Sequence, residues 1–137
     1  MAVIKELIRK DENETLSFGD YSLAAKTKKS DFEFGGDLYK VKTFKEMTKL
    51  EKNGLFLYES VPGTSVFDFA ESEGETSFTV EGDQDAQITI GLEDDSEYEV
   101  FVGGESAGKM STNLSGKLNI SVELEGIGAV QVKLVKC

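Results

Sequence analysis

Apolar and polar side chains alternate along the second half of the chain, which predicts β-strands with one buried and one solvent-facing side. The alternation is clearest in the four segments 87–92, 97–102, 117–124 and 130–135. Phe67 with Phe69, and Phe78 with Val80, predict two further strands. Short turns rich in Gly, Asp and Ser separate these segments. Closely spaced short strands of this kind are typical of an antiparallel sandwich or barrel.

The first half of the chain shows a weaker pattern of the same kind. Segments 15–18 and 21–25 are predicted strands on either side of Gly19-Asp20. Segments 31–34 and 38–44 flank Gly35-Gly36-Asp37, which is a typical hairpin turn. These pairs predict a second group of antiparallel strands near the N-terminus.

Two segments fit more than one structure. In segment 44–52, Phe44, Met47 and Leu50 lie at helical spacing, which fits a short helix. The same segment ends at Asn53-Gly54, a strong hairpin signal before a run of large apolar residues, and we favour the hairpin. Residues 3–9 fit either a strand or one or two helical turns.

The domain organisation follows from the only proline, which lies in the turn Val61-Pro62-Gly63. We expect residues 1–137 to form a single all-β, mainly antiparallel domain. Residues 1–62 are expected to form a smaller N-terminal β lobe, and residues 63–137 a C-terminal, sandwich-like unit packed against it.

Charge divides the chain at almost the same place. Residues 1–60 carry eleven basic and eleven acidic residues, whereas residues 61–137 carry four lysines and fifteen acidic residues. The second half therefore accounts for the whole net charge of −11. Ten of the thirteen Phe and Tyr residues, by contrast, lie at or before Phe69. We expect two surfaces of different chemistry on one molecule.

The residues needed for most catalytic and metal chemistry are missing from the sequence. There is no histidine, Arg9 is the only arginine, and Cys137 is the only cysteine. Imidazole-based triads, thiolate metal sites and guanidinium clamps are therefore excluded. We expect a protein that is not an enzyme and that uses no cofactor and no metal. A hydrolase based on two carboxylates is the catalytic alternative, and it needs two such groups about 5–10 Å apart in a pocket.

Two motifs resemble ion-binding or nucleotide-binding loops, and both depart from the pattern. Segment 103–109 has phosphate-loop spacing, but Met110 stands where the loop needs Ser or Thr, so a Gly-rich hairpin explains it better. Glu81, Asp83 and Asp85 begin like a calcium loop, but the sixth and twelfth positions are Ala86 and Leu92. Asp94, Asp95 and Glu97 form another acidic turn. We interpret the acidic groups as solvated hairpin ends.

Two surfaces suggest partners. Segment 26–52 interleaves eight lysines with aromatic residues, but five acidic residues among them and the acidic second half argue against nucleic acid. A sugar-binding or other small-ligand surface would use aromatic rings, and the candidates are Tyr21, Tyr39, Tyr58 and Tyr98. Such a surface requires a cleft lined by at least two of them.

The location and partners follow from simple features. The N-terminus mixes apolar and charged residues and carries no secretory signal, so we expect a cytoplasmic protein that does not bind a membrane. The charge division favours a non-enzymatic interaction module that binds another protein or itself, as a homo-oligomer. A small-ligand or carbohydrate-binding β domain is the alternative.

Three short sequence segments between residues 31 and 64 resemble a known protein family. Segments 36–46, 50–54 and 58–64 resemble a family of small uncharacterised proteins from anaerobic Gram-positive bacteria. Some members are automatically labelled endosialidase, but sialidases resemble one another in using an arginine cluster on a much longer propeller fold. A chain with one arginine does not support that label. The resemblance implies a bacterial, cytoplasmic protein and transfers no site residues.

Overall fold

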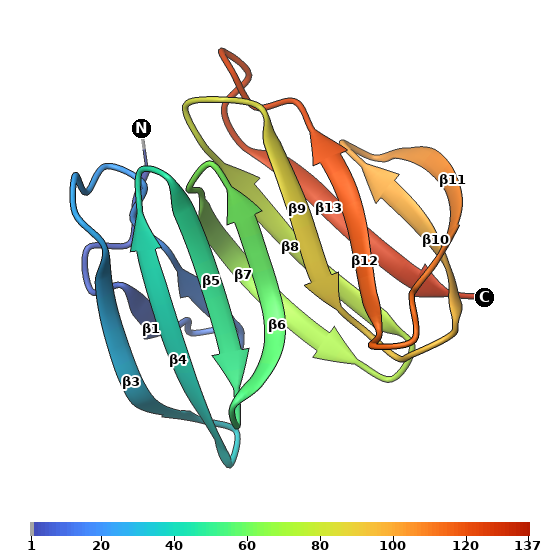
Figure 1. Cartoon of the computed structure of the whole chain (residues 1–137), viewed down its shortest axis with the longest axis horizontal. Helices are drawn as coiled ribbons and strands as arrows, with labels where there is room; N and C mark the ends of the chain where they lie inside the picture. Colours follow the sequence, from blue (N-terminus) through green and yellow to red (C-terminus); the bar gives the residue numbers. More distant parts are fainter. Residues whose placement is uncertain (1) are drawn as a thin grey trace.

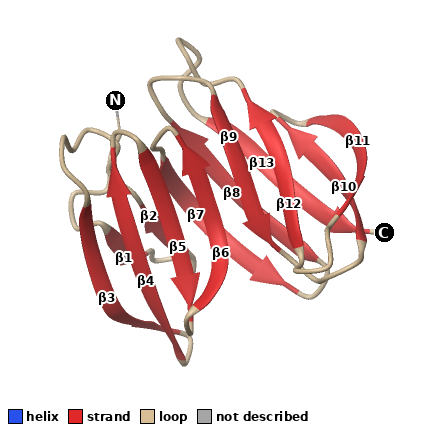
Figure 2. Cartoon of the chain, viewed as in Figure 1, coloured by secondary structure: helices blue, strands red, loops and turns tan. Residues whose placement is uncertain are grey.

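The computed structural model describes residues 2–137, which fold into two antiparallel β-sheets packed face to face as a sandwich (Figure 1). The seven-stranded sheet contains, in spatial order, β1 (Ile8–Lys10), β2 (Leu16–Phe18), β7 (Ser65–Ser72), β8 (Glu75–Glu81), β13 (Val130–Lys136), β10 (Glu97–Val102) and β11 (Glu105–Ser111). The six-stranded sheet contains β12 (Lys117–Val122), β9 (Ala86–Gly91), β6 (Leu55–Val61), β5 (Met47–Lys52), β4 (Asp37–Phe44) and β3 (Thr27–Phe34). The all-β, antiparallel prediction is confirmed, and Figure 2 shows strands joined by loops throughout the described chain.

The alternating segments of the second half form the strands that the sequence predicts. In β9, Ile88 and Ile90 are fully buried, whereas the side chain of Gln87 is exposed to solvent. The same alternation holds in β12, where Leu118 and Ile120 point into the core and Asn119 points out. Burial of one face of these alternating strands stabilises the sandwich.

Two hairpins of the first half are also confirmed. β3 and β4 pair across Gly35-Gly36, and β5 pairs with β6 across Asn53-Gly54, where both turn residues have positive φ. The helix that would fit segment 44–52 does not form, because Leu50 and Thr48 are buried on one side of a strand. The phosphate-loop-like segment 103–109 is the β10–β11 turn and the first part of β11.

One prediction for the first half is wrong, and one segment left open forms a strand only at its end. Segment 21–25 is a turn rather than a strand, because the Asp20 carboxylate accepts a 3.0 Å hydrogen bond from the Ser22 amide and so stabilises a local turn. In segment 3–9 neither alternative forms along its length. A turn closed by the Leu7 amide on the Ile4 carbonyl comes first, and the strand β1 begins only at Ile8.

The two parts on either side of Val61-Pro62-Gly63 share both sheets. β6 of the first part pairs with β9 of the second, and β2 pairs with β7. One apolar cluster runs between the sheets and includes residues from both parts, such as Leu50 and Leu134. Residues 1–62 thus supply one end of the sandwich and residues 63–137 the other (Figure 1).

A buried polar network joins the two parts beside the Val61-Pro62-Gly63 turn. Thr64 is fully buried, and its hydroxyl lies 2.8 Å from both the Tyr58 hydroxyl and the Ser60 hydroxyl. The Thr64 carbonyl accepts a 2.7 Å hydrogen bond from the Thr48 hydroxyl. Every buried side-chain polar atom in the described part of the chain has a partner. Such networks are stable only when all members are satisfied.

Candidate functional site

The four candidate tyrosines lie in the protein core rather than on a common surface. Their exposed fractions are 3% for Tyr21, 5% for Tyr39, 0% for Tyr58 and 2% for Tyr98. Tyr58 packs edge-on against Phe18 and Phe78, with ring centroids 5.3 and 5.6 Å apart. Buried rings of this kind contribute packing energy but offer no face for a sugar to stack on. The structure therefore does not bring the four together as a ligand surface.

Burial makes several of these phenols hard to ionise. Burial, followed by the nearby carboxylates of Glu81, Asp83 and Asp20, raises the pKa of Tyr21 from 10.0 to about 12. Burial also raises the pKa of Tyr39, although Lys52 opposes the effect. The pKa of Tyr58 is raised further by complete burial. These shifts favour the neutral phenols in the folded state.

An alkaline titration should show this difference. Because the raised pKa belongs to the folded state, the stability that neutral Tyr21 contributes is complete below pH 10 and is lost as the pH rises towards about 12. The chain has no tryptophan, so the near-ultraviolet absorbance of tyrosinate reports these groups cleanly. We expect Tyr21→Phe to remove a component that titrates near pH 12. Loss of a component that titrates near pH 10 would contradict this assignment.

A small cleft lies between the sheets at the end of the sandwich where β3 meets β4. Its volume is about 220 Å³, and Phe34, Tyr39 and Phe69 form part of its wall. Lys52 reaches into it and lies 3.3 Å from Glu71 and 3.6 Å from Asp37. Burial favours the neutral amine, but Glu71, Tyr39 and Asp37 together leave the pKa of Lys52 raised. The carboxylates of Asp37 and Glu71 thus both form ion pairs with Lys52. Of the four candidate tyrosines, only Tyr39 lines this cleft.

One member of the acidic motif Glu81, Asp83 and Asp85 has a structural role. The Asp85 carboxylate accepts hydrogen bonds of 2.9 and 3.1 Å from the amides of Leu124 and Glu125, and these bonds lower its pKa. Within residues 2–137, no group of three His, Cys, Asp or Glu side chains is arranged to hold a metal ion. Asp85 therefore ties the β8–β9 turn to the loop after β12.

The outer face of the six-stranded sheet carries a line of lysines that the sequence did not reveal. The strand register places Lys28 opposite Lys42, and Lys42 opposite Lys49. We call these three residues the lysine row. Glu59 follows opposite Lys49 on the next strand. Like charges directly opposite one another on neighbouring strands destabilise a sheet, so this arrangement costs folding energy.

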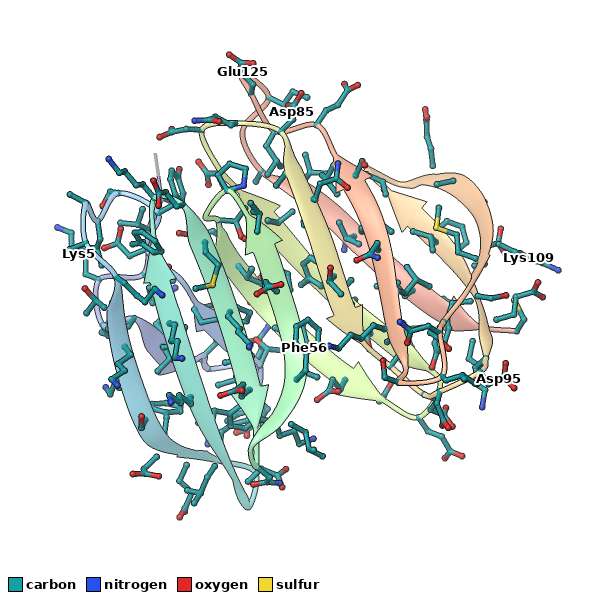
Figure 3. All side chains as sticks on the ribbon, viewed as in Figure 1. Lys5, Phe56, Asp85, Asp95, Lys109 and Glu125 are labelled. Carbon is teal, nitrogen blue, oxygen red and sulfur yellow. The ribbon has the colours of Figure 1, made fainter. Side chains whose placement is uncertain are left out.

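Aromatic rings and further lysines flank the lysine row. The Lys49 and Lys117 ammonium groups lie 5.9 and 4.5 Å from the centre of the Phe56 ring, which is labelled in Figure 3. Lys26 lies 5.7 Å from the Phe44 ring. The two rings are half-buried, so part of each is open to solvent. Ring faces attract cations and keep these lysines close to the sheet.

The ion pairs of the protein form elsewhere. Among residues 2–137, ion pairs join Arg9 to Asp11, Lys10 to Glu14, Lys52 to Asp37 and Glu71, Lys133 to Glu75, and Lys136 to Glu93. No member of the lysine row takes part in an ion pair within the described chain. Residues 53–108 contain no basic residue at all, so the strands and loops built from them carry only acidic charge. The acidic charge of the second half is therefore concentrated in the strands from β6 to β10 and the loops that join them.

Comparison of the chain with protein-family models, with curated proteins and with solved structures found no match. The resemblance to a bacterial family therefore stays a prediction. In the described part of the chain, no helix is both long enough and apolar enough to cross a membrane.

Proposed function

We propose that this protein is a non-enzymatic interaction module that associates with further copies of itself through complementary charge. The observation that carries the proposal is the lysine row, Lys28, Lys42 and Lys49, which lies on an open sheet face without ion-pair partners within residues 2–137. A folded chain that keeps like charges opposite one another sacrifices stability, and contact with an acidic surface recovers it. The acidic second half of a further copy supplies such a surface.

Salt tests this proposal in a characteristic way. At about 10 mM salt the Debye length is about 30 Å, so the net charges of −11 on two copies repel one another. At about 0.1 M salt the Debye length falls to about 10 Å, which screens that repulsion but leaves close charge pairs attractive. At about 1 M salt the close pairs are screened as well. We therefore expect association to be strongest near 0.1 M salt.

Static light scattering across this salt series measures the association. The expected result is a weight-average mass of at least twice the 15.0 kDa of one chain near 0.1 M salt, falling to one chain near 1 M. A mass of one chain at every salt concentration would refute self-association. A mass that keeps rising up to 1 M would indicate apolar association instead, because high salt does not weaken apolar contacts.

The small-ligand or carbohydrate-binding alternative has less support. It needs a cleft lined by two of the four tyrosines, whereas the cleft at Lys52 contains Tyr39 alone. Of two further clefts, one is lined by Tyr98 and the other by Tyr39, each without a second tyrosine. A carboxylate-based hydrolase would use the same Lys52 cleft, where Asp37 and Glu71 both contact the lysine ammonium.

A further inference from the structure

A loop of opposite charge projects from the end of the sandwich. Residues 123–129 connect β12 to β13 and carry the exposed carboxylates of Glu123 and Glu125, and we call this segment the acidic loop. It extends beyond the ends of the neighbouring strands, as Figure 1 and the position of Glu125 in Figure 3 show. Residues 118–132 contain no lysine or arginine, so nothing in the segment neutralises these charges.

Hydrogen bonds and a buried side chain anchor the base of the acidic loop. Asp85 accepts hydrogen bonds from the amides of Leu124 and Glu125, and the Ile127 amide donates to the Leu124 carbonyl at 3.1 Å. The Leu124 side chain is fully buried in the core. A loop anchored in this way loses less conformational entropy on binding than an unanchored loop, which favours affinity.

An apolar side chain lies at the tip of the acidic loop. Ile127 is 55% exposed, and it stands between Gly126 and Gly128. On the lysine row the corresponding apolar surface comes from the half-buried rings of Phe44 and Phe56. The two surfaces thus match in kind, since each combines charges of one sign with a small apolar area.

We infer that the acidic loop of one copy docks on the lysine row of a second copy. This inference rests on the proposed self-association and names its two surfaces. Glu123 and Glu125 face the ammonium groups of the row, and Ile127 lies against the neighbouring rings. Within one molecule the loop projects from the end of the sandwich while the row lies on the face of β3–β5, so each copy keeps one of each surface open (Figure 1).

A contact between two unlike surfaces has a consequence for the assembly. Each copy that is bound through its loop still offers its lysine row, so further copies add in the same direction. Such head-to-tail contacts produce either a closed ring or an open chain, rather than a simple symmetric dimer. The mass should therefore rise with concentration beyond that of two chains, unless a small ring closes.

Charge reversal on each surface separately tests the inference. The row-reversed variant is Lys42→Glu with Lys49→Glu, and the loop-reversed variant is Glu123→Lys with Glu125→Lys. Each variant alone pairs like charges across the contact, so we expect each to weaken self-association at least about tenfold near 0.1 M salt. In an equal mixture, loop and row are again of opposite charge between unlike variants, so the mixture is expected to associate.

Matched controls separate this contact from a general effect of charge. Lys109→Glu with Lys136→Glu changes the net charge as much as row reversal does, at two exposed sites on β11 and β13 of the seven-stranded sheet, whereas the lysine row lies on the six-stranded sheet. Glu73→Lys with Glu105→Lys matches loop reversal in the same way. We expect both controls to associate as the wild type does. Circular dichroism shows whether each variant retains the β fold, and the neutral pairs Lys42→Gln with Lys49→Gln and Glu123→Gln with Glu125→Gln replace any that do not.

The outcomes distinguish the inference from the proposed function. A wild-type chain that stays monomeric at every salt concentration removes the proposed function and the inference together. A wild-type chain that associates, with reversed variants that associate equally well or a mixture that stays dissociated, leaves self-association intact and overturns the loop-to-row contact. Loss of association in the matched controls overturns it as well.

Discussion

Replacing Gly63 by alanine should destabilise the fold by about 3 kcal/mol or more, because the backbone of another strand occupies the space of the new side chain. A Cβ atom on Gly63 would overlap the carbonyl oxygen of Phe44 and would lie 3.2 Å from the Phe44 carbonyl carbon. The Gly63 amide also donates a 3.0 Å hydrogen bond to the Lys45 carbonyl, which fixes the two segments at this distance. Neither backbone segment can move away without breaking this hydrogen bond between the two parts of the chain.

Gly82→Ala is a suitable control for this prediction. Gly82 is buried like Gly63, but a Cβ atom there would first meet the end of the Leu124 side chain, at 3.3 Å. A flexible side chain can move by a few tenths of an ångström, whereas a carbonyl in a sheet cannot. Urea denaturation of both variants measures the difference. Equal stability of the Gly63 and Gly82 variants would show that the backbones at Phe44 and Gly63 are not in close contact.

Thr64→Val is expected to cause the second large loss of stability. Valine has nearly the same shape as threonine, so the packing is retained, but the Tyr58 and Ser60 hydroxyls both lose a bond of 2.8 Å. Both residues are fully buried, so their hydroxyls have no contact with bulk solvent. A buried polar group without a partner costs about 1–3 kcal/mol. The Thr64 variant should therefore lose more stability than a typical surface variant.

A double-mutant cycle with Tyr58→Phe tests the cause. Removing the Tyr58 hydroxyl together with the Thr64 hydroxyl eliminates both partners of one hydrogen bond. We expect the double variant to lose less stability than the sum of the two single variants, with a coupling of about 0.5–3 kcal/mol. Strictly additive losses in chemical denaturation would mean that the two hydroxyls do not interact in solution.

Strand alternation made most of the fold predictable. Segments such as 117–122 bury every second residue, and their side chains alone indicate a strand. β11 was harder to recognise as a strand, because its residues are exposed on both sides except Met110 and show no alternation. The strand prediction for segment 21–25 was wrong for the opposite reason. Its composition suits a strand, but the Asp20 side chain forms a turn that depends on its local geometry.

The candidate site was less predictable than the fold, for a physical reason. A tyrosine side chain is compatible with both the protein core and the surface, so the sequence alone does not place it. The packing of Tyr58 against Phe18 and Phe78 shows that it is buried. The lysine row requires the register of three strands. Lys42 and Lys49 are separated by a turn, and a shift of one residue would place them on opposite faces. Counting charges along the sequence indicates that charge is unevenly distributed. Only the strand register shows which lysines lie opposite one another.

Sedimentation velocity of the wild-type chain near 0.1 M salt tests directly whether surfaces of opposite charge associate. Raising the protein concentration from about 1 μM to about 1 mM covers the range of weak protein contacts. Association of this kind predicts a weight-average sedimentation coefficient that rises steadily with concentration and returns to the single-chain value in about 1 M salt. A coefficient that stays at the single-chain value over the whole concentration range near 0.1 M salt would contradict it.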